Sequence, residues 1–205
     1  MAKKAYVYSG TDWVPLASEV TDLTAYSTST EIANTYATKA DNGLVHINTT
    51  SLSAATAHQV NSLFSSTYTN YLVALVLKAN SGGTNVDIRL SASGTPSSTS
   101  YYHNLIRMQY SGASVNGQSA TNTSYFRIHN DLGTNQASAS FYLGSPFVSE
   151  KSSFTTMMNG VSETNQGISM SGGYHNQALS YDGLYIFTGG ANTISGTLSV
   201  YGLKV

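Results

Sequence analysis

Charged side chains are scarce in this chain, and cysteine is absent. Only 9% of the 205 residues are Asp, Glu, Lys or Arg, against about a quarter in an average soluble domain. The formal net charge is −1, so the sequence offers no basic surface and no nucleic-acid partner is expected. The absence of cysteine excludes disulfide bonds and thiolate ligands for a metal.

Long apolar runs are absent as well. The first ten residues contain two lysines but no apolar core of about seven or more residues, so we expect no secretory signal. No stretch approaches the roughly 20 apolar residues that a membrane-spanning helix needs, so no membrane insertion is expected. We expect the chain to be made and assembled in the cytoplasm. The longest apolar run, residues 71–79, predicts a central strand that is covered on both faces.

The residues that are abundant are typical of a packed β structure. Hydrophobic residues make up 40% of the sequence and 15 residues are tyrosine; aromatic and β-branched side chains fit the surface of a sheet. Apolar and polar residues alternate in short segments separated by turns, most clearly at 86–90, 126–128 and 198–200. Short strands in such a series predict an antiparallel β-sandwich, jelly-roll-like, over residues 44–205.

Two details of this sandwich follow from the same pattern. Residues 194–204 alternate regularly and predict a strand that pairs inside a sheet. Residues 114–123 are small and polar, and they predict a loop. No strand–helix–strand rhythm is present, which excludes a doubly wound α/β fold.

Residues 1–19 predict a separate β-hairpin. Alternating residues flank an SGTD turn, and Pro15 keeps the residue before it extended. An isolated hairpin is only marginally stable in water, and this one carries the only tryptophan. We therefore expect it to dock on a different protein as an anchor; docking on its own sandwich is the alternative. The expected anchor residues are Tyr6, Tyr8, Trp13, Val14 and Pro15.

Residues 20–43 are expected to form a short helical stalk. Thr28 and Glu31 match a capping box, and Asn42 with Gly43 is a typical helix stop, which together predict a helix at about 29–41. Such a short helix is marginal alone in water, so we expect three copies to form a parallel bundle; packing on the sandwich is the alternative. The residues expected in this bundle are Ile32, Ala33, Tyr36, Ala37 and Ala40.

The sequence offers little support for catalysis. Glycosidases need two carboxyl groups about 5–10 Å apart, and no two of the carboxylates lie close together on one predicted strand face. Only the fold could bring Asp87 to Asp131, or Glu150 to Glu163. We therefore expect a protein that is not an enzyme.

The histidines show no metal-ligand spacing, and no thiolate assists them. We therefore expect no metal and no cofactor. A metal held on a threefold axis, by one histidine from each of three chains, stays an alternative. The five histidines are His46, His58, His103, His129 and His175.

Two aromatic clusters are the best candidates for a binding site. Each follows a segment of small residues, and amphipathic rings beside amide groups suit shallow carbohydrate recognition. The alternative is that one ring of each pair fills the core while the other lines a trimer interface. The candidate glycan-binding residues are Tyr101, Tyr102, His103, Tyr174, His175 and Asn176.

Five segments resemble parts of bacteriophage proteins. Residues 5–18 and 25–41 resemble the N-terminal attachment segment and short shaft of phage fibre proteins. Residues 63–77, 88–102 and 196–204 are similar to the C-terminal module of phage tail-fibre-like virion proteins, especially those of marine cyanophage-type viruses. This resemblance implies a trimeric jelly-roll head on a stalk, anchored to the virion through its N-terminus.

Composition and resemblance together predict a structural protein of a phage virion. We expect a homotrimer, anchored to other virion proteins by residues 1–19, that is assembled in the host cytoplasm. Residues 44–205 are expected to face outward and to bind a host surface glycan. A capsid decoration protein with a mainly structural role is the alternative, and a polysaccharide depolymerase is a third hypothesis.

Overall fold

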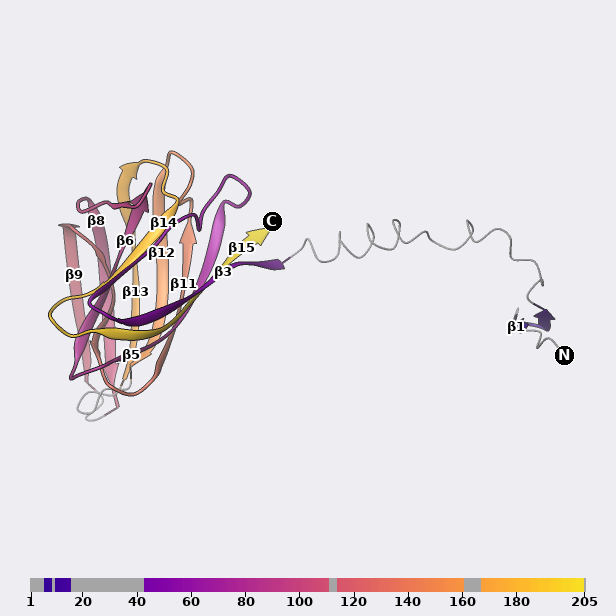
Figure 1. The fold of residues 1–205 in the computed structure, drawn as a ribbon, viewed down its shortest axis with the longest axis horizontal. Helices are drawn as coiled ribbons and strands as arrows, with labels where there is room; N and C mark the ends of the chain where they lie inside the picture. The colour runs from indigo at the N-terminus through magenta and orange to yellow at the C-terminus, as the bar shows by residue number, and fades with distance from the viewer. Residues whose placement is uncertain (1–5, 9, 16–42, 111–113, 161–166, 205) are drawn as a thin grey trace. The chain divides into compact units, whose positions relative to one another are not determined.

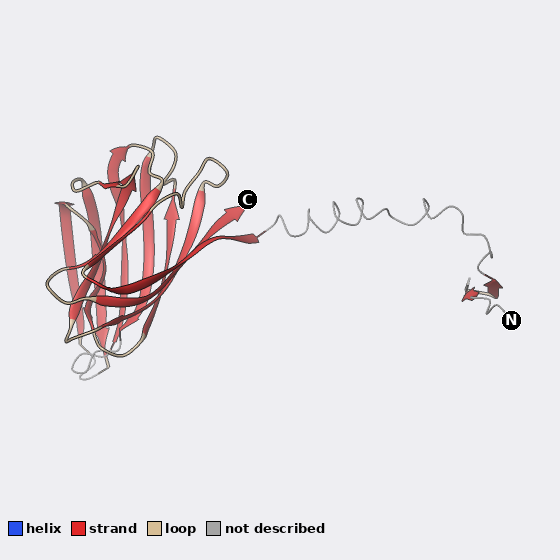
Figure 2. Cartoon of the chain, in the orientation of Figure 1, coloured by secondary structure: helices blue, strands red, loops and turns tan. Residues whose placement is uncertain are grey.

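The structure is a computed structural model that describes residues 6–8, 10–15, 43–110, 114–160 and 167–204. The chain divides into two units, residues 1–42 and 43–205, and each is described separately. Every regular element in the described ranges is a β-strand (Figure 2). None of the described residues belongs to a helix that is long and apolar enough to cross a membrane.

The first unit contains the predicted hairpin. Strands β1 (Tyr6–Tyr8) and β2 (Trp13–Pro15) pair antiparallel, with Tyr8 opposite Trp13. Gly10, with φ +98°, supplies the left-handed backbone of the turn between them. The predicted helix at 29–41 lies outside the described residues. So do all the residues expected in the trimer stalk, namely Ile32, Ala33, Tyr36, Ala37 and Ala40.

The described residues of the second unit form thirteen strands, β3 to β15, most of which are labelled in Figure 1. Their bounds are β3 Gly43–Ala55, β4 Ala57–Val60, β5 Asn70–Ala79, β6 Thr84–Ala92, β7 Thr95–Pro96, β8 Tyr101–Gln109, β9 Val115–Thr123, β10 Phe126–Leu132, β11 Ala137–Gly144, β12 Lys151–Gly160, β13 Gly167–Ala178, β14 Gly183–Thr188 and β15 Ile194–Lys204.

These strands form two antiparallel sheets. The large sheet has eight strands in the order β3-β15-β5-β11-β12-β13-β8-β9, and the small sheet has the order β10-β6-β14-β4, with β7 paired to β6. One cluster of buried hydrophobic residues takes side chains from both sheets. The predicted antiparallel β-sandwich is therefore confirmed.

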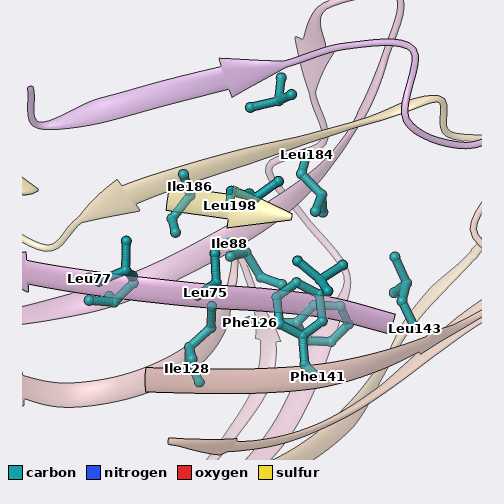
Figure 3. Close-up of a cluster of buried hydrophobic side chains, with 14 of the residues drawn as sticks. Leu75, Leu77, Ile88, Phe126, Ile128, Phe141, Leu143, Leu184, Ile186 and Leu198 are labelled. Atoms are coloured by element: carbon teal, nitrogen blue, oxygen red, sulfur yellow. The ribbon is translucent and has the colours of Figure 1, made fainter. Parts of the chain in front are cut away.

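The core lies between the two sheets. Figure 3 shows Leu75, Leu77 and Leu198 of the large sheet pointing toward Ile88 and Ile186 of the small sheet. All five side chains are at most 1% exposed. Burying a Leu or Ile side chain stabilises a fold by about 1.5–3 kcal/mol, so this interface holds the sheets together.

Strand β15 lies in the interior of the large sheet, between β3 and β5. The predicted pairing of residues 194–204 inside a sheet is therefore confirmed. Leu198 and Val200 are buried on the core side. At Gly196, which has φ +153°, a Cβ would overlap the Val76 carbonyl oxygen of β5, so glycine permits the close approach of the two backbones.

The predicted loop at 114–123 is wrong, because β9 occupies Val115–Thr123 and pairs with β8. All side chains of β9 are exposed or half-buried. It is the edge strand of the large sheet, so it needs no apolar alternation, and the sequence pattern gave no strand signal.

The prediction that residues 71–79 are covered on both faces is also wrong for a single chain. Alternate residues from Tyr71 to Ala79 are buried in the core. On the opposite face, Leu72 and Ala74 are half-buried and Val76 is 36% exposed. The outer face of the large sheet is therefore not covered by the described part of the chain.

Candidate functional site

The two predicted aromatic clusters come together on neighbouring strands. In the pairing of β8 with β13, Tyr102 lies opposite Tyr174 and Tyr101 lies opposite His175. The exposed Asn176 follows directly, and its backbone N–H donates to the Ser100 carbonyl oxygen over 2.8 Å. The sequence offered these clusters as separate candidates, and the strand register makes them one site.

Strand alternation places three of the six candidate residues inside the sandwich. Tyr101 and His175 are 0% exposed and His103 is 7% exposed. The Tyr101 hydroxyl accepts a hydrogen bond from Leu90 N over 2.9 Å and donates one to Ser97 O over 3.1 Å. Tyr101 and His175 are too deeply buried to contact a ligand at the surface and act here as core residues, whereas the mostly buried His103 also borders the hollow described below.

The other two rings lie on the outer face of the large sheet. Tyr102 and Tyr174 stack with ring centroids 5.0 Å apart and an angle of 2° between the rings. Tyr174 is 40% exposed and Tyr102 is half-buried. Because the two residues are direct cross-strand partners, the register of β8 and β13 fixes the stack.

A shallow hollow of about 270 Å³ lies beside this stack. Gly172 and Asn104 lie opposite each other in the next outward-facing pair of β13 and β8. Glycine leaves the floor open, since a Cβ there would meet only the Phe154 carbonyl oxygen, at 3.7 Å. We call this the tyrosine hollow, and its lining includes Tyr102, Asn104, Ala120, Thr121, Gly172 and Tyr174.

An exposed apolar patch lies farther along the same face. Met157, Met170 and Ile106 are 54%, 53% and 51% exposed, and they lie side by side across β12, β13 and β8. With Met108, which is 47% exposed, they form the Met–Ile patch. This patch was not expected from the sequence. The signal that could have indicated it is a pair of consecutive apolar residues in a strand, as in Leu105 and Ile106, since one of the two must then face away from the core.

Met157, Met170 and Ile106 belong to a row of cross-strand neighbours that crosses the whole large sheet. No side chain in this row is charged. From β3 to β9 the row contains Thr49, Ser199, Ala74, Ser140, Met157, Met170, Ile106 and Gly117. A hollow of about 230 Å³ lies beside Met157, and its lining includes Ser138, Ser140 and Ile168. This row of the outer face is therefore neutral and partly apolar.

Two of the described carboxylates, Asp87 and Asp182, are held by hydrogen bonds within the sandwich. Asp87 is 1% exposed, and its two oxygens accept hydrogen bonds from Arg127 Nε and Nη2 over 2.8 and 3.0 Å. Asp182 Oδ1 accepts a hydrogen bond from Ser93 N over 2.9 Å. Glu163 lies outside the described residues, and among those described no three His, Asp or Glu side chains could together hold a metal ion.

Two histidines are buried as neutral rings. Burial lowers the pKa of both His103 and His129 to about 4, and nearby arginines act in the same direction. His129 is 1% exposed; its Nδ1 is 2.7 Å from Ser169 Oγ, and its Nε2 has no hydrogen-bond partner among the described residues. A proton added to either ring would place a charge in the core.

Because these two histidines are buried as neutral rings, we expect the free energy of unfolding of the sandwich to fall in acid. Their pKa is lower in the folded chain than the ordinary 6.5, so as pH falls from about 6.5 toward 4 the unfolded chain binds protons that the folded chain does not. The thermal unfolding midpoint should fall over this window. His129→Gln should reduce the fall, whereas His46→Gln, at an exposed position, should not. Equal acid sensitivity of the wild type and His129→Gln would contradict this assignment.

Comparison with known proteins adds no family to this description. No protein-family model matches the chain, and no curated protein matches its sequence.

Proposed function

We propose that the chain is a non-enzymatic structural protein of a bacteriophage virion, whose sandwich binds carbohydrate on the host surface. The resemblance of residues 5–18, 25–41, 63–77, 88–102 and 196–204 to parts of phage fibre proteins supports the virion role. The single observation that carries the attachment role is the stacked Tyr102–Tyr174 pair, exposed beside the tyrosine hollow. Flat aromatic faces next to amide and hydroxyl groups suit the faces and hydroxyls of a sugar.

The strand order supports the jelly-roll part of the proposal. We number eight strands 1 to 8 in chain order: β3, β4, β5, β6, β10, β11, β14 and β15. Their orders in the two sheets are then 1-8-3-6 and 2-7-4-5, the arrangement of a jelly roll with two Greek keys. The remaining pairs, β8 with β9 and β12 with β13, widen the large sheet and carry the tyrosine hollow.

Assembly into a homotrimer is supported by the outer face of the large sheet. Exposed apolar patches rimmed by polar residues are typical of interaction surfaces. The row through Met157 and Met170 carries no charge, so identical faces of several copies can approach without like-charge repulsion. We therefore take two further copies of this chain as the partners that cover the Met–Ile patch. Three weak glycan sites on one particle would then gain from avidity.

The tyrosine hollow can be tested by filling it. Gly172→Val adds a side chain to the floor of the hollow, where a Cβ would be in ordinary contact with the Phe154 carbonyl oxygen at 3.7 Å, and it leaves both tyrosines in the sequence. The purified full-length variant should bind a glycan array at least about tenfold more weakly than the wild type, a loss of about 1.4 kcal/mol.

Gly190→Val is the matched control for this experiment. Gly190 is exposed and lies outside the tyrosine hollow, and a Cβ added there would meet no atom within 4 Å. Its binding should equal that of the wild type. If the wild-type protein bound no glycan on the array, the attachment role would be contradicted. The Met–Ile patch would then favour the second candidate, a capsid decoration protein with a structural role.

A further inference from the structure

A polar cleft lies at the open edge of the sandwich. Strand β9 is the edge of the large sheet and β10 is the edge of the small sheet, so the inner side chains there border on water. The space between them has a volume of about 310 Å³, the size of a small-molecule site. We call it the edge cleft, and its polar lining is Asn85, Arg107, Asn116, Gln118, Arg127, Asn130 and Asp131.

Hydrogen bonds hold one wall of the edge cleft in place. Asp87 binds Arg127 through both carboxylate oxygens. Arg127 Nη1 donates to Asn130 Oδ1 over 3.0 Å, and Asn130 Nδ2 donates to Gln118 Oε1 over 2.7 Å. This chain of contacts joins β6, β10 and β9 and fixes the orientation of both amides. It leaves the Gln118 Nε2 group as a donor with no partner among the described residues.

Arg107 differs from the other arginines of the sandwich. Arg127 is paired with Asp87, and Arg89 Nε donates to the Ser124 carbonyl oxygen over 2.7 Å. Arg107 is half-buried, and its guanidinium forms no hydrogen bond or ion pair with any residue that the structure describes. Its cross-strand neighbour on β9 is Asn116, whose side-chain amide is likewise unpaired within the described ranges. A half-buried guanidinium loses hydration, and an oxygen ligand would compensate for that loss.

We propose that the edge cleft binds a carboxylate-bearing sugar unit, with Arg107 holding the carboxylate. A guanidinium fork matches a carboxylate through two parallel hydrogen bonds. Carboxamides both donate and accept, as sugar hydroxyls do, and Asn116, Gln118 and Asn85 offer three of them. The lining contains no aromatic side chain, and its one carboxylate is Asp131. The site therefore holds its ligand through the Arg107 guanidinium and the amides rather than by stacking. This site goes beyond the proposed function, because it shares no residue with the tyrosine hollow.

The test is a titration of the full-length protein with D-glucuronate, D-galacturonate and N-acetylneuraminate at fixed ionic strength, followed by NMR. At least one of these sugars should bind saturably, whereas D-glucose and acetate should not. Arg107→Gln should weaken binding at least about tenfold, and Asn116→Ala should weaken it several-fold. Thermal melting shows whether each variant is folded. If Arg107→Gln does not fold, the binding of acidic sugars by Asn116→Ala, a substitution at an exposed position, tests the proposal in its place.

Lys78→Gln removes the same charge at an exposed position of β5 and should bind like the wild type. The double variant Tyr102→Ala and Tyr174→Ala should also keep its binding of acidic sugars, which separates this site from the proposed attachment site. The proposal is overturned if none of the acidic sugars binds, if glucose or acetate binds equally well, or if Arg107→Gln and Asn116→Ala bind like the wild type. An equal loss in Lys78→Gln would overturn it too, since it would show a general charge effect.

Discussion

Replacing Met157 and Met170 with lysine should convert the proposed trimer to a monomer. The two side chains are cross-strand neighbours at the centre of the Met–Ile patch, and both are more than half exposed in the single chain. In a trimer they would be buried, and several unpaired buried ammonium groups would cost far more than the apolar contact they replace. The particle mass should fall from three times 21.7 kDa to 21.7 kDa.

Light scattering measures this mass directly, and a matched variant controls for the added charge. Val148 and Leu179 are 39% and 51% exposed and lie outside the outer rows of the large sheet. The pair Val148→Lys and Leu179→Lys should leave the trimer intact. A wild-type protein that is already a monomer, or a Met157→Lys and Met170→Lys variant that stays a trimer, would rule out the Met–Ile patch as the trimer contact.

The same variant should also lose most of its binding to a glycan-coated surface. Linking binding sites raises the apparent affinity by about 10²–10⁴-fold when several sites engage together, and a monomer forgoes this gain. Its affinity for a free sugar in solution should not change, because the tyrosine hollow lies farther along β8 and β13. A parallel loss of free-sugar binding would show that the substitutions had damaged the sandwich itself.

Arg127→Met should have the largest effect on the stability of the sandwich. Asp87 is 1% exposed, and Arg127 is its ion-pair partner at 2.8 Å. Removing one member of a buried pair leaves an uncompensated charge, which typically costs about 3–5 kcal/mol. The free energy of unfolding, measured by urea denaturation at neutral pH, should fall by about that amount.

Two further measurements separate the unpaired charge from lost packing. Adding Asp87→Asn to Arg127→Met removes the buried charge, so most of the lost stability should return. Burial raises the pKa of Asp87, and the hydrogen bonds from Arg127 oppose that shift. Without Arg127 the pKa should rise further. The deficit relative to the wild type should therefore shrink as pH falls and the carboxyl is protonated. A deficit that is unchanged in acid and in the double variant would assign the loss to packing instead.

The sandwich could be predicted from the sequence because its central strands carry a local signal. Residues 86–90, 126–128 and 198–200 alternate with a period of two, and this period places every second side chain in the core. The turn at residues 9–12 likewise predicted the hairpin of β1 and β2. These features depend on neighbouring residues only, so a single sequence contains them.

The candidate site depended on contacts between distant residues. The sequence placed Tyr101 and Tyr102 together, but only the packing of β10 against β8 decided that Tyr101 faces the core and Tyr102 faces outward. The register of β8 with β13 then decided that Tyr102 stacks on Tyr174. A shift of one residue would have reversed both assignments.

The edges and faces of the sheets were likewise decided by the tertiary structure. Strand β9 has no apolar alternation because it borders on water, and β5 carries apolar residues on a face that the described chain leaves uncovered. Local patterns report how much apolar surface a strand has, but not what covers it. Strand order and register, which join residues far apart in the chain, determine where the Met–Ile patch, the tyrosine hollow and the edge cleft lie.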